Sequence, residues 1–125
     1  MIKEPLDILI AEDDEVNFIY FKSIFKDNAS KIIHAYNGKE AVELCRENPD
    51  ISFVIMDIKM PVMNGIDATQ EIRAFRKDLP IVALTAYAMT SDEKLALSAG
   101  CNAYFVKPVK KLDILDKFKQ LGLFD

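Results

Sequence analysis

Five residues with acidic, hydroxyl or amino side chains follow apolar runs, and their types suit chemistry on a phosphate group. They are Glu12, Asp13, Asp57, Thr85 and Lys107. Neighbouring carboxylates repel one another unless a cation lies between them, and carboxylates with water and a phosphate oxygen are ligands that Mg²⁺ prefers. With a metal bound, Asp57 can attack phosphorus as a nucleophile, while Thr85 and Lys107 bind oxygens of the transferred group. These residue types therefore predict phosphoryl transfer onto the protein itself.

The sequence alternates five short apolar runs with amphipathic segments, and these elements must position the polar residues. The runs are residues 8–11, 32–35, 53–56, 81–84 and 104–106. Each is rich in β-branched or aromatic residues, which is typical of strands buried on both faces of a parallel sheet. The pattern predicts an α/β fold, with an open, doubly wound parallel sheet and helices on both faces. Half of a barrel is disfavoured because both of its sheet edges would stay exposed.

The segments between the runs have apolar residues at helical spacing. The stripe predicted for the first helix consists of Val16, Ile19, Tyr20, Ser23 and Ile24. The stripe predicted for the last helix consists of Leu112, Leu115, Phe118 and Leu121. The third helix is expected to begin after Asn64-Gly65, and the fourth to end near Gly100. His34 has no ligand-type partners nearby in sequence and is expected to be a packed or edge histidine.

Length, charge and cysteine usage exclude several classes of protein. The 125 residues favour a single domain, residues 1–125. Sixteen basic and 20 acidic side chains leave a net charge of −4, which argues against a nucleic-acid-binding surface. No apolar run is long enough for a membrane span or a signal-peptide core. Cys45 and Cys101 are isolated, so we expect a reduced, cytoplasmic setting without a structural zinc site.

The ends of the strands must meet for the polar residues to act together. In a parallel sheet the carboxyl ends lie along one edge, and ligands bind where the strand order reverses. If the order is 2-1-3-4-5, Glu12, Asp13 and Asp57 converge at that point. Each residue alone has an ordinary alternative, such as an acid in the first turn of a helix or an N-cap. Their joint occurrence favours a site.

Four blocks of the sequence resemble the signature motifs of bacterial receiver domains. They are ILIAEDDEVN at 8–17, MDIKMPVMNG at 56–65, ALTA at 83–86 and VKP at 106–108. The resemblance covers residues 6–121 and implies a flavodoxin-like (βα)5 sandwich with strand order 2-1-3-4-5. The blocks are most similar in character to the receiver domains of hybrid sensor histidine kinases.

The resemblance implies a role for each residue of the acidic cluster. Asp57 would be the phosphoacceptor, and Asp13 would bind Mg²⁺ directly. Glu12 stands where Asp is commoner in the family, and its longer side chain could bind the metal through water. The backbone carbonyl of Lys59 would be a further metal ligand.

Other positions match the phosphoryl-binding and switch residues of the family. Thr85 and Lys107 would hold the phosphoryl oxygens, and Thr85 and Tyr104 would form the switch. The resemblance also implies a cis peptide bond between Lys107 and Pro108.

The function implied is that of a phosphoacceptor module in a two-component phosphorelay. The donor would be a histidine kinase or a histidine phosphotransfer domain. The output would be a change in the face made by the fourth helix, fifth strand and fifth helix, which we also expect to form a weak homodimer. We expect no direct contact with nucleic acid or membrane, and a cytoplasmic location, whether the chain acts alone or belongs to a membrane-bound sensor kinase.

Three other functions are weighed against this one. A Mg²⁺-dependent phosphohydrolase needs a second carboxylate near its nucleophile, whereas Lys59 and Tyr87 stand two residues beyond Asp57 and Thr85. A flavin- or nucleotide-binding protein is disfavoured because no glycine-rich loop follows the first strand. A degenerate receiver used only for docking is disfavoured by the intact Asp57 and Lys107.

Overall fold

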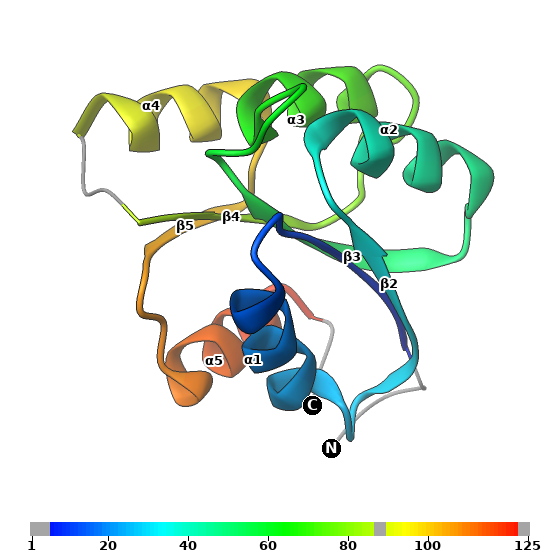
Figure 1. The fold of residues 1–125 in the computed structure, drawn as a ribbon, viewed down its shortest axis with the longest axis vertical. Coiled ribbons are helices and arrows are strands. Elements are labelled where there is room, and N and C mark those ends of the chain that lie inside the picture. The colour runs from blue at the N-terminus through cyan, green and yellow to red at the C-terminus, as the bar shows by residue number, and fades with distance from the viewer. Residues whose placement is uncertain (1–5, 87–89, 123–125) are drawn as a thin grey trace.

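The computed structural model describes residues 6–86 and 90–122, and this part of the chain alternates five strands with five helices (Figure 1). The strands are β1 (Leu6–Ala11), β2 (Ala29–Ala35), β3 (Ile51–Asp57), β4 (Ile81–Thr85) and β5 (Ala103–Val106). The helices are α1 (Glu15–Phe25), α2 (Gly38–Glu47), α3 (Gly65–Arg73), α4 (Thr90–Ala99) and α5 (Lys111–Gln120). Tyr87, weighed above as a neighbour of the site, lies outside the described residues.

All pairs of neighbouring strands are parallel, and the sheet has the order β2-β1-β3-β4-β5. This confirms the doubly wound topology. Near the carboxyl ends, Ala11 of β1 is in register with Met56 of β3, and Asp57 of β3 with Leu84 of β4. The three strands β1, β3 and β4 therefore end close to one another, at the edge where the sequence predicts a site.

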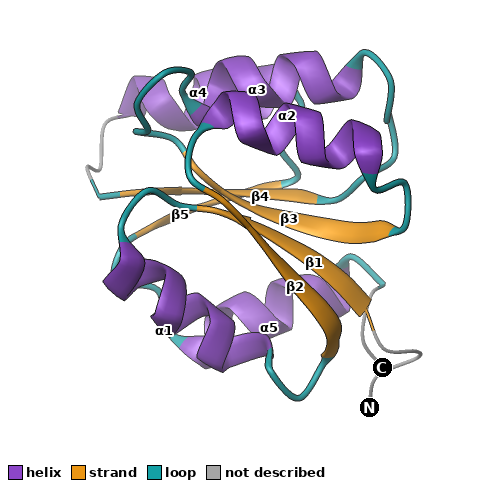
Figure 2. Cartoon of the chain, turned by 45° about the vertical axis from the view of Figure 1, so that its right-hand side comes forward, coloured by secondary structure: helices purple, strands orange, loops and turns teal. Residues whose placement is uncertain are grey.

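Two helical layers cover the sheet (Figure 2). Helices α1 and α5 lie on one face, and α2, α3 and α4 lie on the other. Under α1 and α5 the core is aromatic, with the rings of Phe25, Phe53 and Phe118 within 4.1–5.5 Å of one another, centroid to centroid. Under α2–α4 the core holds many small side chains, including Ala41, Cys45, Ala68, Ala83 and Ala96.

Side-chain caps fix where several helices begin. The carboxylate of Asp14 accepts hydrogen bonds from the backbone N–H groups of Val16 and Asn17 at the start of α1. Asn37 caps α2 and Asn64 caps α3 in the same way. Helix α4 ends before Gly100, which has a φ of +116°. The predicted end of α4 is confirmed, and α3 begins at Gly65, one residue earlier than predicted.

The buried face of α1 differs from the predicted stripe. Val16 and Ile19 are 75% and 61% exposed, so of the predicted apolar stripe only Ile24 lies in the core. It is joined there by Phe21 and Phe25, which the stripe did not include. The two phenylalanines bury more apolar area than the valine and isoleucine, so they determine which way the helix faces. Leu112 of α5 is likewise exposed.

None of the described helices is long and apolar enough to cross a membrane. Cys45 and Cys101 are both buried free thiols, as expected for cysteines without a metal-site spacing.

Candidate phosphoacceptor site

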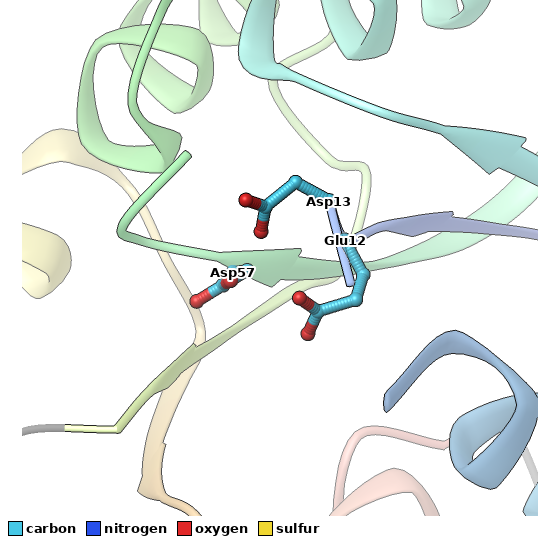
Figure 3. A group of neighbouring side chains, drawn as sticks. All are labelled: Glu12, Asp13 and Asp57. Atoms are coloured by element: carbon cyan, nitrogen blue, oxygen red, sulfur yellow. The ribbon is translucent and has the colours of Figure 1, made fainter. Parts of the chain in front are cut away.

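Three carboxylates meet at the carboxyl edge of the sheet (Figure 3). Glu12 and Asp13 directly follow β1, and Asp57 is the last residue of β3. One oxygen of each carboxylate lies within 4.8 Å of the others. Glu12 and Asp57 are 1% and 4% exposed, while Asp13 is exposed. The predicted convergence of these residues is therefore present, with one side of the cluster open to solvent.

Gly65 allows α3 to begin directly against the end of β3. Its backbone N–H donates to the carbonyl oxygen of Ile58 at 2.9 Å, which closes the loop after Asp57. A Cβ atom at position 65 would clash with the backbone oxygen of Asp57, which leaves no room for any side chain. The glycine thus allows β3, the loop after it and α3 to lie in close contact.

Lys107 reaches the cluster from the end of β5. Its backbone N–H donates to the Thr85 carbonyl oxygen at 2.7 Å, and the following bond to Pro108 is cis. Its Nζ lies 2.6 Å from Glu12 Oε1 and 3.5 Å from Asp57 Oδ2. One half-buried cation therefore lies beside two buried carboxylates, and its closer partner is Glu12, a pairing that sequence reasoning missed.

The pKa of Asp57 is raised from its ordinary value of 3.8 to about 7. Burial is the largest cause, the negative charge of Glu12 adds to the increase, and the positive charge of Lys107 opposes it. Lys107 thus offsets only part of the cost of burying this carboxylate. A divalent cation between the three carboxylates would favour the ionised form, so the donor set fits a hard metal ion.

The other predicted site residues lie around this cluster. Thr85 is fully buried at the end of β4. Tyr104 of β5 is half-buried and packs against the core under α2–α4. The side chain of Lys59 is exposed in the loop after β3, and its backbone carbonyl as a metal ligand stays a prediction.

His34 is packed, as expected, but its hydrogen bond was not foreseen. The ring lies between Phe18 and Tyr36, and its Nε2 is 2.8 Å from the backbone oxygen of Glu12. Only the strand order, which brings the end of β2 beside that of β1, could have suggested this contact.

The fold and the acidic cluster at its switch point define a phosphoacceptor module. The chain belongs to the response regulator receiver domain family, whose model matches residues 8–119. It is therefore a receiver domain of two-component signalling.

Two curated relatives show where such domains occur. The chain is 32% identical over 118 residues to the polar-differentiation response regulator DivK of Brucella anthropi, covering 92% of this chain and 94% of DivK. It is 43% identical over 116 residues to the hybrid signal transduction histidine kinase G of Dictyostelium discoideum. That match covers 89% of this chain but 3% of the kinase, so it concerns one segment of a much longer protein.

Two solved structures are similar over most of the chain. The receiver domain of the sensor histidine kinase PA1611 of Pseudomonas aeruginosa, which has a magnesium ion in its active-site cleft, is 31% identical with a TM-score of 0.84. The match covers 95% of this chain and 99% of that one. The receiver domain of Saccharomyces cerevisiae Ssk1, solved with the phosphotransfer protein Ypd1, is 32% identical with a TM-score of 0.84, covering 94% and 89%.

Proposed function

We propose that Asp57 accepts a phosphoryl group from a phosphohistidine in a reaction that requires Mg²⁺. The observation that carries this proposal is the buried Asp57 carboxylate, which lies beside those of Glu12 and Asp13 and 3.5 Å from Lys107 Nζ. The magnesium in the cleft of the PA1611 receiver supports the same choice of metal. Glu12, Asp13, Asp57 and the carbonyl of Lys59 would hold the ion.

Asp57 and the groups around it would have separate roles in the phosphoryl transfer. An Asp57 carboxylate oxygen forms the new bond to phosphorus, the phosphorus–nitrogen bond breaks, and its electron pair returns to the donor imidazole. Bound Mg²⁺ would neutralise charge on the transferred group. Lys107 would bind one phosphoryl oxygen from its present position, and the Thr85 hydroxyl would bind another.

The donor must cover the open side of the cluster, and the rim beside it is apolar. A groove of about 580 Å³ runs between α1 and the segment after β5, and its lining includes Val16, Tyr20, Lys107 and Pro108. The exposed Val16 and Ile19 extend this apolar rim. We propose that a histidine kinase or histidine phosphotransfer domain docks here. The complex of Ssk1 with Ypd1 supports this class of partner.

We propose that phosphorylation is read at the α4-β5-α5 face. Thr85 would move toward the phosphoryl group, and Tyr104 would move with it. Exposed apolar side chains already lie on these elements, namely Leu95, Leu97, Val106 and Leu112. They suit a partner, or a weakly bound second copy, that binds the two states with different affinities. The ring signals of Tyr104 in NMR, with and without beryllofluoride, test the movement, and a fixed ring environment at full occupancy would contradict it.

We place this single domain in the cytoplasm, where its two buried thiols stay reduced. It acts as a signalling module, alone or as part of a hybrid kinase, and not as a turnover enzyme. A continuous release of phosphate from small phosphate esters would favour the phosphohydrolase instead.

Intact-mass measurement after treatment with a small phosphodonor tests the phosphoacceptor. We expect one added phosphoryl group with Mg²⁺, and none with a chelator or in Asp57→Asn. Asp50→Asn is a matched control, because Asp50 is exposed just before the other end of β3. Full labelling of Asp57→Asn would overturn the assignment.

A further inference from the structure

The peptide groups on both sides of Glu12 are held by β2. The N–H of Glu12 donates to the backbone oxygen of Ala35 at 2.9 Å. The carbonyl oxygen of Glu12 lies 2.8 Å from Nε2 of His34, and since a carbonyl can only accept, Nε2 carries the hydrogen. Strand β1 ends at Ala11, so the imidazole holds the chain one residue beyond the regular ladder.

The ring of His34 is itself fixed from two sides. It stacks on Phe18 of α1 with the centroids 3.7 Å apart and the planes 1° from parallel. Tyr36 covers the other face at 3.9 Å, and its hydroxyl donates to Glu15 Oε1 at 3.0 Å. The imidazole therefore keeps its direction toward the Glu12 carbonyl.

The orientation of this carbonyl bears on the acidic cluster. Successive side chains of an extended strand point to opposite sides, yet Glu12 and Asp13 both direct a carboxylate oxygen to the same small region. The plane of the peptide group between them determines whether they can converge. The Asp13 side chain is exposed, so its direction depends strongly on the backbone that precedes it.

We infer that His34 is a positioning residue for the metal site, which it acts on by holding the Glu12–Asp13 peptide group through Nε2. The inference rests on the proposed function of the acidic cluster in binding Mg²⁺. His34 touches neither the metal nor the phosphoryl group. Its contribution would be to orient two adjacent ligands before the ion binds, as outer hydrogen-bond partners do in other metal sites.

Two substitutions separate the hydrogen bond from the stacking. His34→Phe keeps an aromatic ring between Phe18 and Tyr36 but removes the donor. His34→Gln removes the ring but places an amide N–H₂ near the position of Nε2. We expect Mg²⁺ titration by calorimetry at one fixed pH to show about tenfold weaker binding in His34→Phe. We expect His34→Gln to stay within about threefold of the wild type.

A measurement without metal tests the same contact directly. The hydrogen bond accepted by the Glu12 carbonyl polarises the peptide group, so the amide nitrogen of Asp13 should change its NMR shift in His34→Phe and largely keep it in His34→Gln. Phe18→Leu, which weakens the stacking but leaves the donor, should lower the unfolding temperature and retain Mg²⁺ affinity.

Several results would overturn the inference. One is a wild-type affinity for Mg²⁺ in His34→Phe. A second is an equal loss of Mg²⁺ affinity in His34→Phe and His34→Gln, and a third is a loss of Mg²⁺ affinity in Phe18→Leu as large as that in His34→Phe. If the wild-type protein itself binds no Mg²⁺, the proposed metal site fails as well. The wild-type titration therefore distinguishes the two failures.

Discussion

The two faces of the sheet are packed by different means. Beneath α1 and α5, three phenylalanine rings meet edge-to-face or tilted within a cluster of isoleucines, and each is less than 2% exposed. Beneath α2–α4 the contacts are made mainly by alanine, cysteine and medium-sized side chains. Large interlocked rings leave few alternative arrangements, so the first layer is the more rigid base.

The faces also differ in how well their polar groups are satisfied. In the described part of the chain, three buried side-chain polar atoms have no hydrogen-bond partner, and none lies on α1 or α5. Two of them, Asp92 Oδ2 and the Tyr104 hydroxyl, belong to α4 and β5. Unsatisfied groups lower the cost of rearrangement, because a new conformation can give them partners.

Strand alternation connects this difference to function. Alternate residues of a strand point to the same face of the sheet. On β3, Asp57 therefore points to the same face as Ile55 and Phe53, the face covered by α1 and α5. On β4, Thr85 points to the same face as Ala83, the face covered by α2–α4. Tyr104 packs on the second side as well. The proposed acceptor thus points to the aromatic layer, and the residues proposed to sense the phosphoryl group point to the layer of small side chains.

The largest expected effect is the loss of stability when a side chain of the aromatic core is truncated, compared with truncation in the small-residue core. Phe118→Ala should lower the free energy of unfolding by about 3–5 kcal/mol, because it removes a buried ring that packs against both Phe25 and Phe53. Cys45→Ala, in the small-residue core, should lower it by only about 1 kcal/mol. Urea denaturation measures both, and equal losses would remove the distinction between the faces.

The next effect concerns the charge on Asp57. The folded protein holds a proton on Asp57 between about pH 4 and pH 7, where the unfolded chain does not, because its pKa is raised to about 7. Wild-type stability should therefore fall as pH rises through this window, by on the order of 2–4 kcal/mol.

Asn at position 57 cannot titrate, so the stability of Asp57→Asn should lack this dependence on pH. The free energy of unfolding of Asp57→Asn, relative to that of the wild type, should therefore be higher at pH 8 than at pH 4. Unfolding in urea at both pH values without Mg²⁺ is the measurement. A slope that is identical in the two proteins would show that Asp57 is not the group responsible.

A smaller effect is expected from the metal. At a concentration 20 times its dissociation constant, Mg²⁺ should stabilise the folded protein by about 2 kcal/mol. Asp13→Asn should reduce this gain, and Asp116→Asn, an exposed position on α5, should not. An equal gain in all three proteins would indicate a nonspecific salt effect.

The smallest expected effect is the change in stability when the hydroxyl group of Tyr20 or of Tyr104 is removed. Tyr20→Phe should cost about 1 kcal/mol, because the Tyr20 hydroxyl donates to the backbone oxygen of Val109. Tyr104→Phe should be neutral or stabilising by up to about 1 kcal/mol, because its buried hydroxyl has no partner among the described residues. Thermal unfolding of the pair measures the difference, and equal losses would contradict it.

Much of this structure follows from local sequence patterns. The continuous apolar runs located all five strands, and the polar residues after them located the acidic cluster. The pattern could not choose between two apolar stripes on α1, because that choice depends on how Phe21 and Phe25 fit against β-strand residues far away in sequence. For the same reason, the contacts of Lys107 with Glu12 and of His34 with the Glu12 carbonyl became visible only with the fold.

The ion pair between Glu12 and Lys107 joins residues 95 positions apart in the chain. Asp57 comes from near the midpoint between them, so the site draws on the first, third and last strands of the sheet. Contacts of such sequence separation form late, after most of the loop-closure entropy has been lost. A chain still emerging from the ribosome, or one missing its last strand, would lack the lysine and could not complete the site. Only a completely folded domain would then be able to accept a phosphoryl group.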